Sequence, residues 1–413
     1  MRIHWIWLAT RPDLSDRKKR AVLEVFPDPE DAYLANEKAL SAVDGLTAEE
    51  LASLLDKDLT QAAKILEACE EKEIRVCVFS DDAYPFRLKN IDDPPLVLYY
   101  RGQLPDFNRA PAIAVVGTRK ASAYGMTAAR QMGFQLVRCG AILVSGAADG
   151  IDGAAMEGAL LSGGTVVGVL GCGADVVYPK CNRRLFEDTR LRGCLLSEFP
   201  PATPPYKWNF PKRNRIISGL SNGVLVVEAP ARSGALITAR QALEQGRDVF
   251  AMPGNVGVDT SEGTNELLRS GAILARDGWD VVEEYQHLYP DAVRRYDGGQ
   301  AQLRLLTPNR EETEAKVAQT PKKMAKASSP DKKQEKKPVD KEEKPTYSDL
   351  HTRLASLSEQ ERLLIEKIEN ECLVDELIVR TGLSAGKVLA MLTMLEVRGF
   401  VKTMPGRRVK IKQ

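Results

Sequence analysis

Apolar runs alternate with amphipathic stretches between residues 111 and 285, and this alternation most constrains the possible fold. Nearly continuous aliphatic runs are typical of parallel strands buried on both faces, with helices covering the sheet. We therefore predict a doubly wound, Rossmann-like α/β domain over residues 105–290, with ligands at the carboxyl ends of its strands. The predicted strands are Ala112–Gly117, Ala141–Gly146, Thr165–Gly171, Cys194–Phe199, Val224–Ala229 and Asp248–Gly254. The predicted helices are Tyr124–Arg138, Asp152–Leu161, Ala235–Gln245 and Asn265–Ser270.

Residues 1–104 are predicted to form a small helical domain and a connector. Apolar residues recur at helical spacing in residues 41–55, and Thr47 precedes Glu50 in a capping-box arrangement. Gly45 and Leu46 between two short helices are compatible with a helix–hairpin–helix or sterile-alpha-motif-like bundle, although a plain packing domain is the simpler interpretation. Residues 93–102 are expected to enter the next domain as a strand.

Residues 291–350 are predicted to be a charged, flexible linker. Residues 321–345 alone contain nine lysines, five acids and scattered prolines. Such a composition cannot bury enough apolar surface to offset the entropy lost on ordering. A solvated tether and a lysine arm that contacts DNA are both compatible with this pattern.

Residues 351–413 are predicted to form a winged helix–turn–helix domain. Three helical stretches precede a basic two-stranded ribbon around Pro405 and Gly406. The third helix, 385–395, has Lys387 as its one cation, so few of its side chains suit the reading of base edges. A duplex-binding transcriptional regulator and a wing that docks a partner remain alternatives for this domain.

Several enzyme classes lack their motifs in this chain. There is no phosphate-binding P-loop, and Val176 stands where a dinucleotide fingerprint after Gly171 needs glycine. The three histidines lie outside the glycine-rich loops, and the seven cysteines form no CxxC pair. These absences argue against a P-loop ATPase, a dinucleotide-dependent enzyme and a histidine- or zinc-based hydrolase, so we expect no cofactor and no metal site.

Charge and hydropathy narrow the possible partners and location. Because 58 basic residues face 57 acidic ones, a nucleic-acid partner would have to be held by a local basic site. No apolar run approaches the roughly 18 residues of a membrane span. The short apolar start at residues 3–9 runs into Arg11 and Asp13, unlike a secretory signal. We therefore expect a cytoplasmic protein with no membrane partner.

Small residues, hydroxyls and cations cluster where predicted strands end. In any one of these turns, the glycine and hydroxyl residues are explained by the needs of the turn itself. Together they predict an anion-binding edge, because glycine lets backbone amides approach a phosphate and arginine binds phosphate in a bidentate manner. These residues are Gly117, Thr118 and Arg119 after the first strand, Ser145 and Gly146 after the second, and Ser233 and Gly234 before the helix that follows the fifth.

The stretch Tyr206–Arg215 has four cations, three aromatic residues and no acid, and Lys180 lies upstream of it. Cations that follow a phosphate backbone, combined with aromatic faces that stack on bases, are what single-stranded nucleic acid requires. A basic surface loop with Trp208 and Phe210 packed into the core is the alternative.

These segments, in this order, resemble the DNA processing protein A (DprA/Smf) family. The helical N-terminal and winged-helix C-terminal domains resemble the same family more loosely. The matching segments are Val115–Lys120, Val144–Gly146, Gly150–Asp152, Val169–Gly173, Val177–Pro179, Leu196–Pro201, Asn209–Ile217, Ser233–Arg240, Ala251–Gly254 and Glu262–Leu268.

The resemblance implies a protein that is not an enzyme and has no catalytic residues. Its extended Rossmann-like domain would bind single-stranded DNA during natural transformation, protect it and load the RecA recombinase onto it. It also implies a homodimer. By position, Gly117, Thr118 and Arg119 resemble the family's phosphate-gripping motif, and Phe210 resembles its base-stacking aromatic residue. The remaining carried-over DNA-binding positions are Lys180, Lys207, Lys212, Arg213, Asn214 and Ser233. The self-association surface maps near Leu267, Leu268 and Ile273, which core packing explains equally well.

Three positions depart from the family's pattern. Thr118 replaces the usual serine and keeps the hydroxyl, so we expect this change to be tolerated. Asp149 stands where the family usually has a basic residue, which could lower local affinity for phosphate. Met156 replaces a common histidine.

A related Rossmann design occurs in nucleotide-monophosphate phosphoribohydrolases, which makes a hydrolase the alternative enzyme hypothesis. Those enzymes recognise phosphate with a Pro-Gly-Gly-x-Gly-Thr loop. Here the segments 253–256 and 262–264 only partly match that loop and are separated by an insertion.

Overall fold

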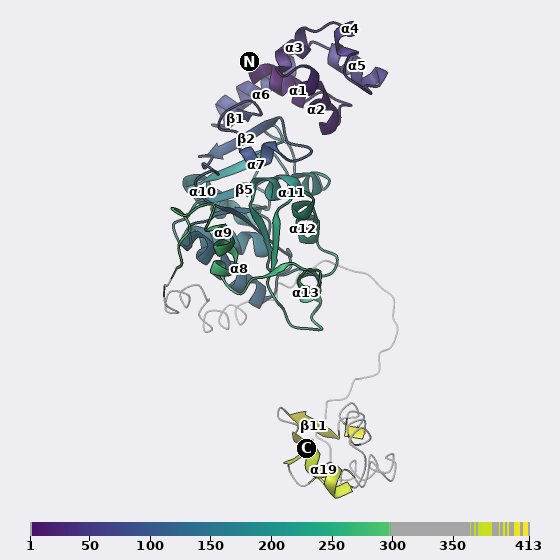
Figure 1. The fold of residues 1–413 in the computed structure, drawn as a ribbon, viewed down its shortest axis with the longest axis vertical. Helices are drawn as coiled ribbons and strands as arrows, with labels where there is room; N and C mark the ends of the chain where they lie inside the picture. Colours follow the sequence, from purple (N-terminus) through teal and green to yellow (C-terminus); the bar gives the residue numbers. More distant parts are fainter. Residues whose placement is uncertain are drawn as a thin grey trace, which may run out of the picture. The chain divides into compact units, whose positions relative to one another are not determined.

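The computed structural model describes residues 2–296 and 298 and, within 364–411, the residues of a small C-terminal unit (Figure 1). The chain divides into two compact units, Met1–Pro321 and Lys322–Gln413. Most of the predicted linker 291–350 lies outside the described residues, as do most of the predicted helix 385–395 and the hairpin tip 405–407. In the second unit, the described residues between 364 and 411 are 364, 367, 368, 371–381, 388, 391, 392, 395, 400–404 and 408–411.

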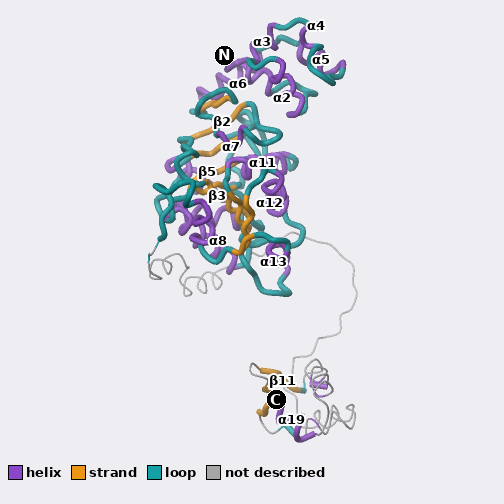
Figure 2. The backbone as a smooth tube through the Cα atoms, in the orientation of Figure 1, coloured by secondary structure: helices purple, strands orange, loops and turns teal. Residues whose placement is uncertain are grey.

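A nine-stranded sheet forms the centre of the first unit, in the order β1-β2-β6-β5-β4-β3-β7-β8-β9 (Figure 2). All neighbours from β6 to β9 pair in parallel, and β2 pairs antiparallel with both β1 and β6. The predicted doubly wound parallel sheet is therefore confirmed. The strands are β1 Arg75–Val78, β2 Val97–Gly102, β3 Ala112–Val116, β4 Ile142–Ser145, β5 Val166–Val169, β6 Cys194–Ser197, β7 Gly223–Val226, β8 Asp248–Ala251 and β9 Ile273–Leu274.

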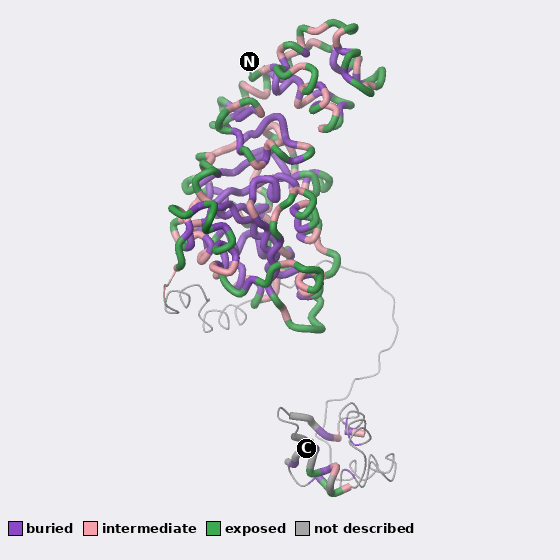
Figure 3. The backbone as a smooth tube through the Cα atoms, in the orientation of Figure 1, coloured by how far each residue is buried: buried purple, intermediate pink, exposed green. Residues whose placement is uncertain are grey.

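Helices cover both faces of this sheet. One buried core lies between the sheet and α8, α9, α10 and α14, and a second lies between the sheet and α7, α11 and α12 (Figure 3). The predicted helices are present as α8, α9, α12 and α13, whereas α10 and α11 were not predicted. Their bounds are α7 Phe86–Lys89, α8 Ala123–Arg138, α9 Ile151–Leu161, α10 Arg183–Arg192, α11 Asn209–Leu220, α12 Gly234–Glu244, α13 Glu262–Arg269 and α14 Gly278–Val282, with 3-10 turns η1 Lys180–Asn182, η2 Asp259–Ser261 and η3 Glu283–Tyr285.

The helix that follows β3 lies on one face of the sheet, and the helix that follows β7 lies on the other. Because β3 and β7 are neighbours, the loops after them diverge and leave a crevice at their carboxyl ends. This is the position at which open α/β sheets bind ligands.

A helical bundle precedes the sheet, built on the buried side chains of Trp7, Leu40 and Leu54. The apolar start of the chain is helix α1 of this bundle, and the predicted capping box is confirmed by reciprocal hydrogen bonds of 2.8 and 3.2 Å between Thr47 and Glu50. The strands β1 and β2 extend the main sheet, so the connector is part of it; the domain limit at 104 stays a proposal. The helices are α1 Arg2–Ala9, α2 Asp16–Val25, α3 Pro29–Leu34, α4 Glu37–Leu40, α5 Ala48–Leu55 and α6 Thr60–Glu71.

A cluster of charges around the buried pair of Arg215 and Glu198 joins this bundle to α11. The Arg215 guanidinium lies 2.6 Å from the carboxylate of Glu198, 3.0 Å from that of Asp93 and 3.5 Å from that of Asp16 in α2. Lys212 reaches the same Asp16 carboxylate at 2.8 Å. Burial alone would lower the pKa of Arg215, but the surrounding carboxylates raise it, so the guanidinium remains charged.

The C-terminal unit contains helix α19 Val374–Thr381 and a three-stranded antiparallel sheet in the order β10-β12-β11. The predicted ribbon is confirmed as β11 Val401–Met404 paired with β12 Arg408–Ile411. The sequence analysis did not predict β10 Glu371–Leu373, which pairs with β12. Together the helix and ribbon fit the predicted winged-helix class.

We predict that Arg215→Ala lowers the free energy of unfolding by about 3–5 kcal/mol, because it removes the buried cation that lies closest to the buried carboxylate of Glu198. Urea denaturation followed by circular dichroism measures this loss. Arg269→Ala is the matched control, since Arg269 pairs with Glu266 in full contact with solvent and its loss should barely move the midpoint. Equal losses in the two variants would contradict a buried ionic junction.

Candidate nucleic-acid interface

A cavity of about 590 Å³ opens at the carboxyl ends of β3 and β7. Its walls come from the loop after β3, the first turns of α11 and the start of α12. The structure brings nine of the sequence-predicted residues together here: Gly117, Thr118, Arg119, Lys207, Phe210, Arg213, Asn214, Ser233 and Gly234.

Four other predicted residues do not line this cavity. Ser145 is fully buried and donates its hydroxyl to the Val115 carbonyl at 2.7 Å, while Gly146 lies beneath Arg213. Lys180 is exposed in η1, and Lys212 is held in the ionic cluster with Asp16. That any of the predicted residues contacts DNA stays a prediction.

The buried carboxylate of Asp152, at the start of α9, fixes the turns beneath the cavity. It accepts a hydrogen bond from the Gly146 amide at 3.1 Å and another from the Gly117 backbone. Burial raises the pKa of Asp152 above its usual value, and Arg213 and the two amides oppose that shift. The ends of β3 and β4 are thereby held by one side chain.

Arg213 acts as a brace between strands. Its guanidinium donates to the Gly146 carbonyl at 2.7 Å and to the carbonyl of Val169, which joins the ends of β4 and β5. Its Nε donates to Asn214 at 3.2 Å. Burial lowers the pKa of Arg213 to about 10, so the side chain is still protonated at neutral pH. Most of its donors are used by the protein, which favours a positioning role over direct grip on a ligand.

Phe210 lies over the centre of the site. The Arg119 guanidinium carbon is 5.0 Å from the centre of its ring, and the Tyr178 ring is 5.7 Å away. Gly171 permits this placement, because a Cβ there would lie 2.9 Å from the Phe210 ring. An aromatic face with a cation beside it can stack on a nucleobase while the cation binds phosphate.

The amino end of α12 closes the other wall. Ser233 is the N-cap, and its hydroxyl accepts from the Ala235 amide at 3.3 Å. A Cβ at Gly234 would meet nothing within 4 Å, so the backbone there is open to a ligand. The unpaired amides of a helix N-terminus favour an anion.

The basic stretch Tyr206–Arg215 was expected to present four cations to one strand, and the structure divides them. Most of this stretch is the start of α11, so its side chains point in several directions. Lys207 and Arg213 line the cavity, whereas Lys212 and Arg215 enter the ionic cluster. The alternative of core-packed aromatics is also wrong for Trp208, which is exposed.

Among the lining residues that sequence reasoning missed, three are charged or aromatic: Arg232, Tyr178 and Asp152. Arg232 precedes the predicted Ser233-Gly234 turn, so its charge at a helix start could have been noticed. Tyr178 and Asp152 both lie within segments that resemble the family, but the sequence analysis gave neither of them a role in the site. With Arg232 included, the cavity lining has four cations (Arg119, Lys207, Arg213 and Arg232) and, among its described residues, one carboxylate.

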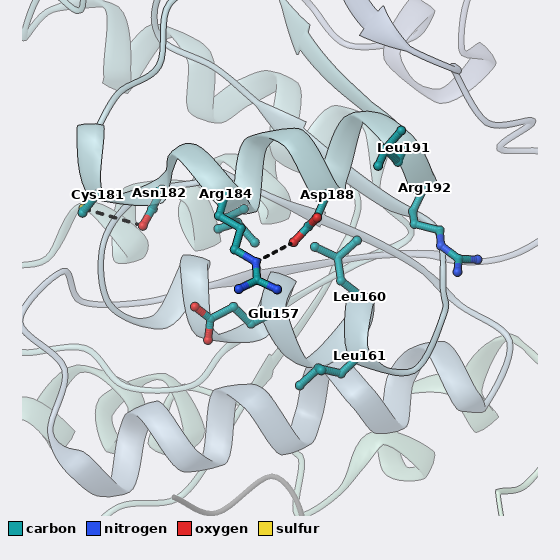
Figure 4. Close-up of a pocket in the computed structure, with 10 residues that line it drawn as sticks. Glu157, Leu160, Leu161, Cys181, Asn182, Arg184, Asp188, Leu191 and Arg192 are labelled. Carbon is teal, nitrogen blue, oxygen red and sulfur yellow. Dashed lines mark hydrogen bonds and ion pairs between the residues drawn. The ribbon is translucent and has the colours of Figure 1, made fainter. Parts of the chain in front are cut away.

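A second cavity, of about 470 Å³, lies beside α9 and α10 and has a different chemistry (Figure 4). Leucines line it together with both signs of charge, as shown by Arg184 and Asp188, whose side chains face each other. None of its lining residues is aromatic. The first cavity therefore suits a polyanion with flat bases far better than the second.

The three departures from the family pattern fall in different surroundings. Thr118 lines the cavity, and its hydroxyl oxygen accepts from the Lys120 amide, so its proton is still available to a ligand. Met156 is fully buried in the core. Asp149 is exposed next to Cys181, outside the lining of the first cavity.

The segments that partly match a phosphoribohydrolase loop lie apart from this cavity. The Gly254 amide donates to the Asn265 side chain at 3.1 Å, and the Thr264 hydroxyl is buried on the Ser261 carbonyl. The cavity lining includes none of residues 253–264. The local geometry thus gives the hydrolase alternative no support.

The described residues lack two kinds of feature. No helix there is both long and apolar enough to cross a membrane. Within the same residues, no group of three or more His, Cys, Asp or Glu side chains is placed to hold a metal ion.

Comparison with known families agrees with this geometry. The family model described as DNA recombination-mediator protein A matches residues 75–286, from β1 to the end of the α/β domain. The chain belongs to this family. The DprA winged helix domain model matches residues 349–407, which confirms the predicted class of the C-terminal domain.

Curated relatives cover much of the chain. DNA processing protein DprA of Bacillus subtilis is 40% identical over 241 residues, which are 58% of this chain and 81% of the relative. Protein Smf of Synechocystis is 34% identical over 384 residues, 92% of this chain and 91% of the relative. The X-ray structure of DprA from Streptococcus pneumoniae is similar with a TM-score of 0.61 and 35% identity, covering 68% of this chain and 97% of that one.

The predicted self-association residues lie at one end of the family's sheet. Leu267 and Leu268 are half-buried in α13, and Leu267 packs against the core. Ile273 is exposed in β9, the last strand of the sheet. Core packing therefore accounts for Leu267, whereas Ile273 is available to a partner. The role of these residues in a dimer stays a prediction.

We predict that Asp152→Ala destabilises the fold, because it leaves the buried amides of Gly117 and Gly146 without an acceptor. The expected loss is roughly 1–3 kcal/mol for each donor left unpaired, measured by urea denaturation. Asp149→Ala is the matched control, an exposed acid in the same turn that should leave stability nearly unchanged. A midpoint for Asp152→Ala equal to that of the control would contradict its role at the strand ends.

Proposed function

We propose that this chain is a single-stranded DNA-binding recombination mediator of the cytoplasm. It protects single strands that enter the cell during natural transformation and loads RecA onto them. It carries out no chemical step itself. The observation that carries the proposal is the cavity at the β3–β7 crevice, whose lining has four cations and the aromatic ring of Phe210.

Each part of the cavity fits one part of a nucleotide. Arg119 can grip a phosphate while the Thr118 hydroxyl supplies a further donor. Phe210 offers its ring to a base at the side of that phosphate. Lys207 and the open start of α12 extend the positive surface along the strand.

The aromatic ring favours unpaired DNA over duplex. A base can reach the Phe210 face within the cavity only if it leaves its complementary strand. Phosphate contacts supply affinity that depends on salt, and stacking accepts every base, so we expect little sequence preference.

Recombinase loading and self-association extend the proposal beyond the cavity. Membership of a recombination-mediator family supports RecA as the partner. Strand β9 is the last strand of the described sheet and Ile273 is exposed on it, which supports a homodimer at that end, because an edge strand presents unpaired backbone groups.

We predict that Arg119→Ala weakens binding of a single-stranded oligonucleotide about ten- to 100-fold, because a charge-assisted contact is lost. The slope of log affinity against log salt should fall by about 0.7 for each phosphate contact removed. Fluorescence anisotropy with a salt titration measures both, and Lys207→Ala and Lys180→Ala are tested beside it. We expect Lys180→Ala to have the smallest effect, because that side chain lies outside the cavity lining.

Arg184→Ala is the matched control for this series. It removes an arginine with 95% of its side chain exposed, at the other cavity. The control should keep the parent affinity and slope. Unchanged affinity in both Arg119→Ala and Lys207→Ala would contradict the proposed groove.

We predict that Ile273→Asp converts a dimer to a monomer, because it places a charge on the exposed end of the sheet. Sedimentation velocity reports the change in mass, and circular dichroism checks the fold. Leu161→Asp is the matched control, an exposed leucine of α9 at the second cavity. A dimer that survives Ile273→Asp unaltered would place self-association on another surface.

A further inference from the structure

Two aromatic side chains lie on the surface just outside the cavity. Trp208 is 71% exposed and Tyr206 is 45% exposed. Their rings are stacked, with centroids 4.7 Å apart and planes inclined by 7°. Side chains of this size are usually packed away from water, so core packing does not explain this pair.

The backbone that carries these rings is fixed at both ends. Asn209 is buried and donates its side-chain N–H to the Gly171 carbonyl at 3.0 Å, while its backbone amide donates to Tyr206 at 3.0 Å. Upstream, the Gly173 amide donates to the Thr203 carbonyl at 2.9 Å. The rings therefore stand on a segment that is fixed at both ends. We call this segment, residues 205–208, the rim of the cavity.

Alternate residues of this rim have different surroundings. Pro205 and Lys207 line the cavity, whereas Tyr206 and Trp208 do not belong to its lining. The same short segment thus offers a cation to the cavity and a flat aromatic pair to solvent. A strand that leaves the cavity past Lys207 crosses the rim beside these rings.

We propose that the Tyr206–Trp208 pair is a second base-stacking platform, which receives bases of the single strand outside the cavity. This rests on the proposed function, since it requires that the cavity hold the strand. Tyr206 supports one face of the Trp208 indole, and the exposure of the indole leaves surface for a base. Because every base has a π-face, the platform accepts any sequence.

An abasic-site scan tests the platform directly. A thymidine oligonucleotide long enough to cross the rim is compared with versions in which one base at a time is removed and the backbone is kept. Binding to the full chain is measured by fluorescence anisotropy. The parent protein should show two groups of sensitive positions, one for Phe210 and one for the platform.

Trp208→Ala should weaken binding about five-fold or more and abolish the effect of abasic sites in the outer group alone. Trp208→Phe should restore most of the affinity, because it keeps an aromatic face. Phe86→Ala is the matched control, since Phe86 is an exposed aromatic residue of α7, which packs near Gly219 at the far end of α11. It should behave as the parent.

The outcomes separate the platform from the proposed function. If Arg119→Ala weakens binding but Trp208→Ala matches the parent at every abasic position, the platform is wrong and the cavity stands. If the parent does not bind single-stranded DNA, both proposals fall. If Trp208→Ala changes only the sedimentation of the protein, the pair is a protein contact and the platform is again overturned.

Discussion

The site depends on two buried charges beneath it, Asp152 and Arg213. Asp152 holds the amides at the ends of β3 and β4, and Arg213 holds the carbonyls at the ends of β4 and β5. Three adjacent strand ends are therefore tied by two side chains that have little contact with solvent. This frame places Arg119 and Phe210 against each other, so the exposed part of the site need not organise itself when a ligand binds.

Helix α11 connects this site to the rest of the first unit. Phe210 and Arg213 face the cavity, while Lys212 and Arg215 bind Asp16 of the helical bundle and Glu198, which directly follows β6. One helix thus sets the position of the base-stacking ring and the attachment of the N-terminal domain. We therefore expect a substitution in the ionic cluster to shift the cavity residues Phe210 and Arg213, because helix α11 carries both sets of side chains.

Much of the fold was predictable because buried parallel strands are continuous apolar runs. All six predicted strands and the glycine turns after them were found where the sequence placed them. The directions in which the cations of Tyr206–Arg215 point were not predictable. Pro211 hid the helical character of the first turn of α11, and the position of each cation around the helix decides which partner it meets. Arg232 and Tyr178 enter the cavity from loops whose course depends on tertiary packing, which no local pattern encodes. Strand β1 was hidden because its antiparallel pairing with β2 is a long-range contact, whereas β2 lies within the strand expected over residues 93–102.

Hydrogen exchange measured by mass spectrometry, with and without a saturating single-stranded oligonucleotide, tests the central claim most directly. We expect slowed exchange in peptides that cover 117–120, 204–214 and 230–238, which surround the cavity. Peptides from the second cavity, around Arg184, and from the winged-helix domain should exchange at the same rate in both states. Protection confined to the winged-helix domain, with none around Arg119, would contradict the account and place DNA binding in the C-terminal unit.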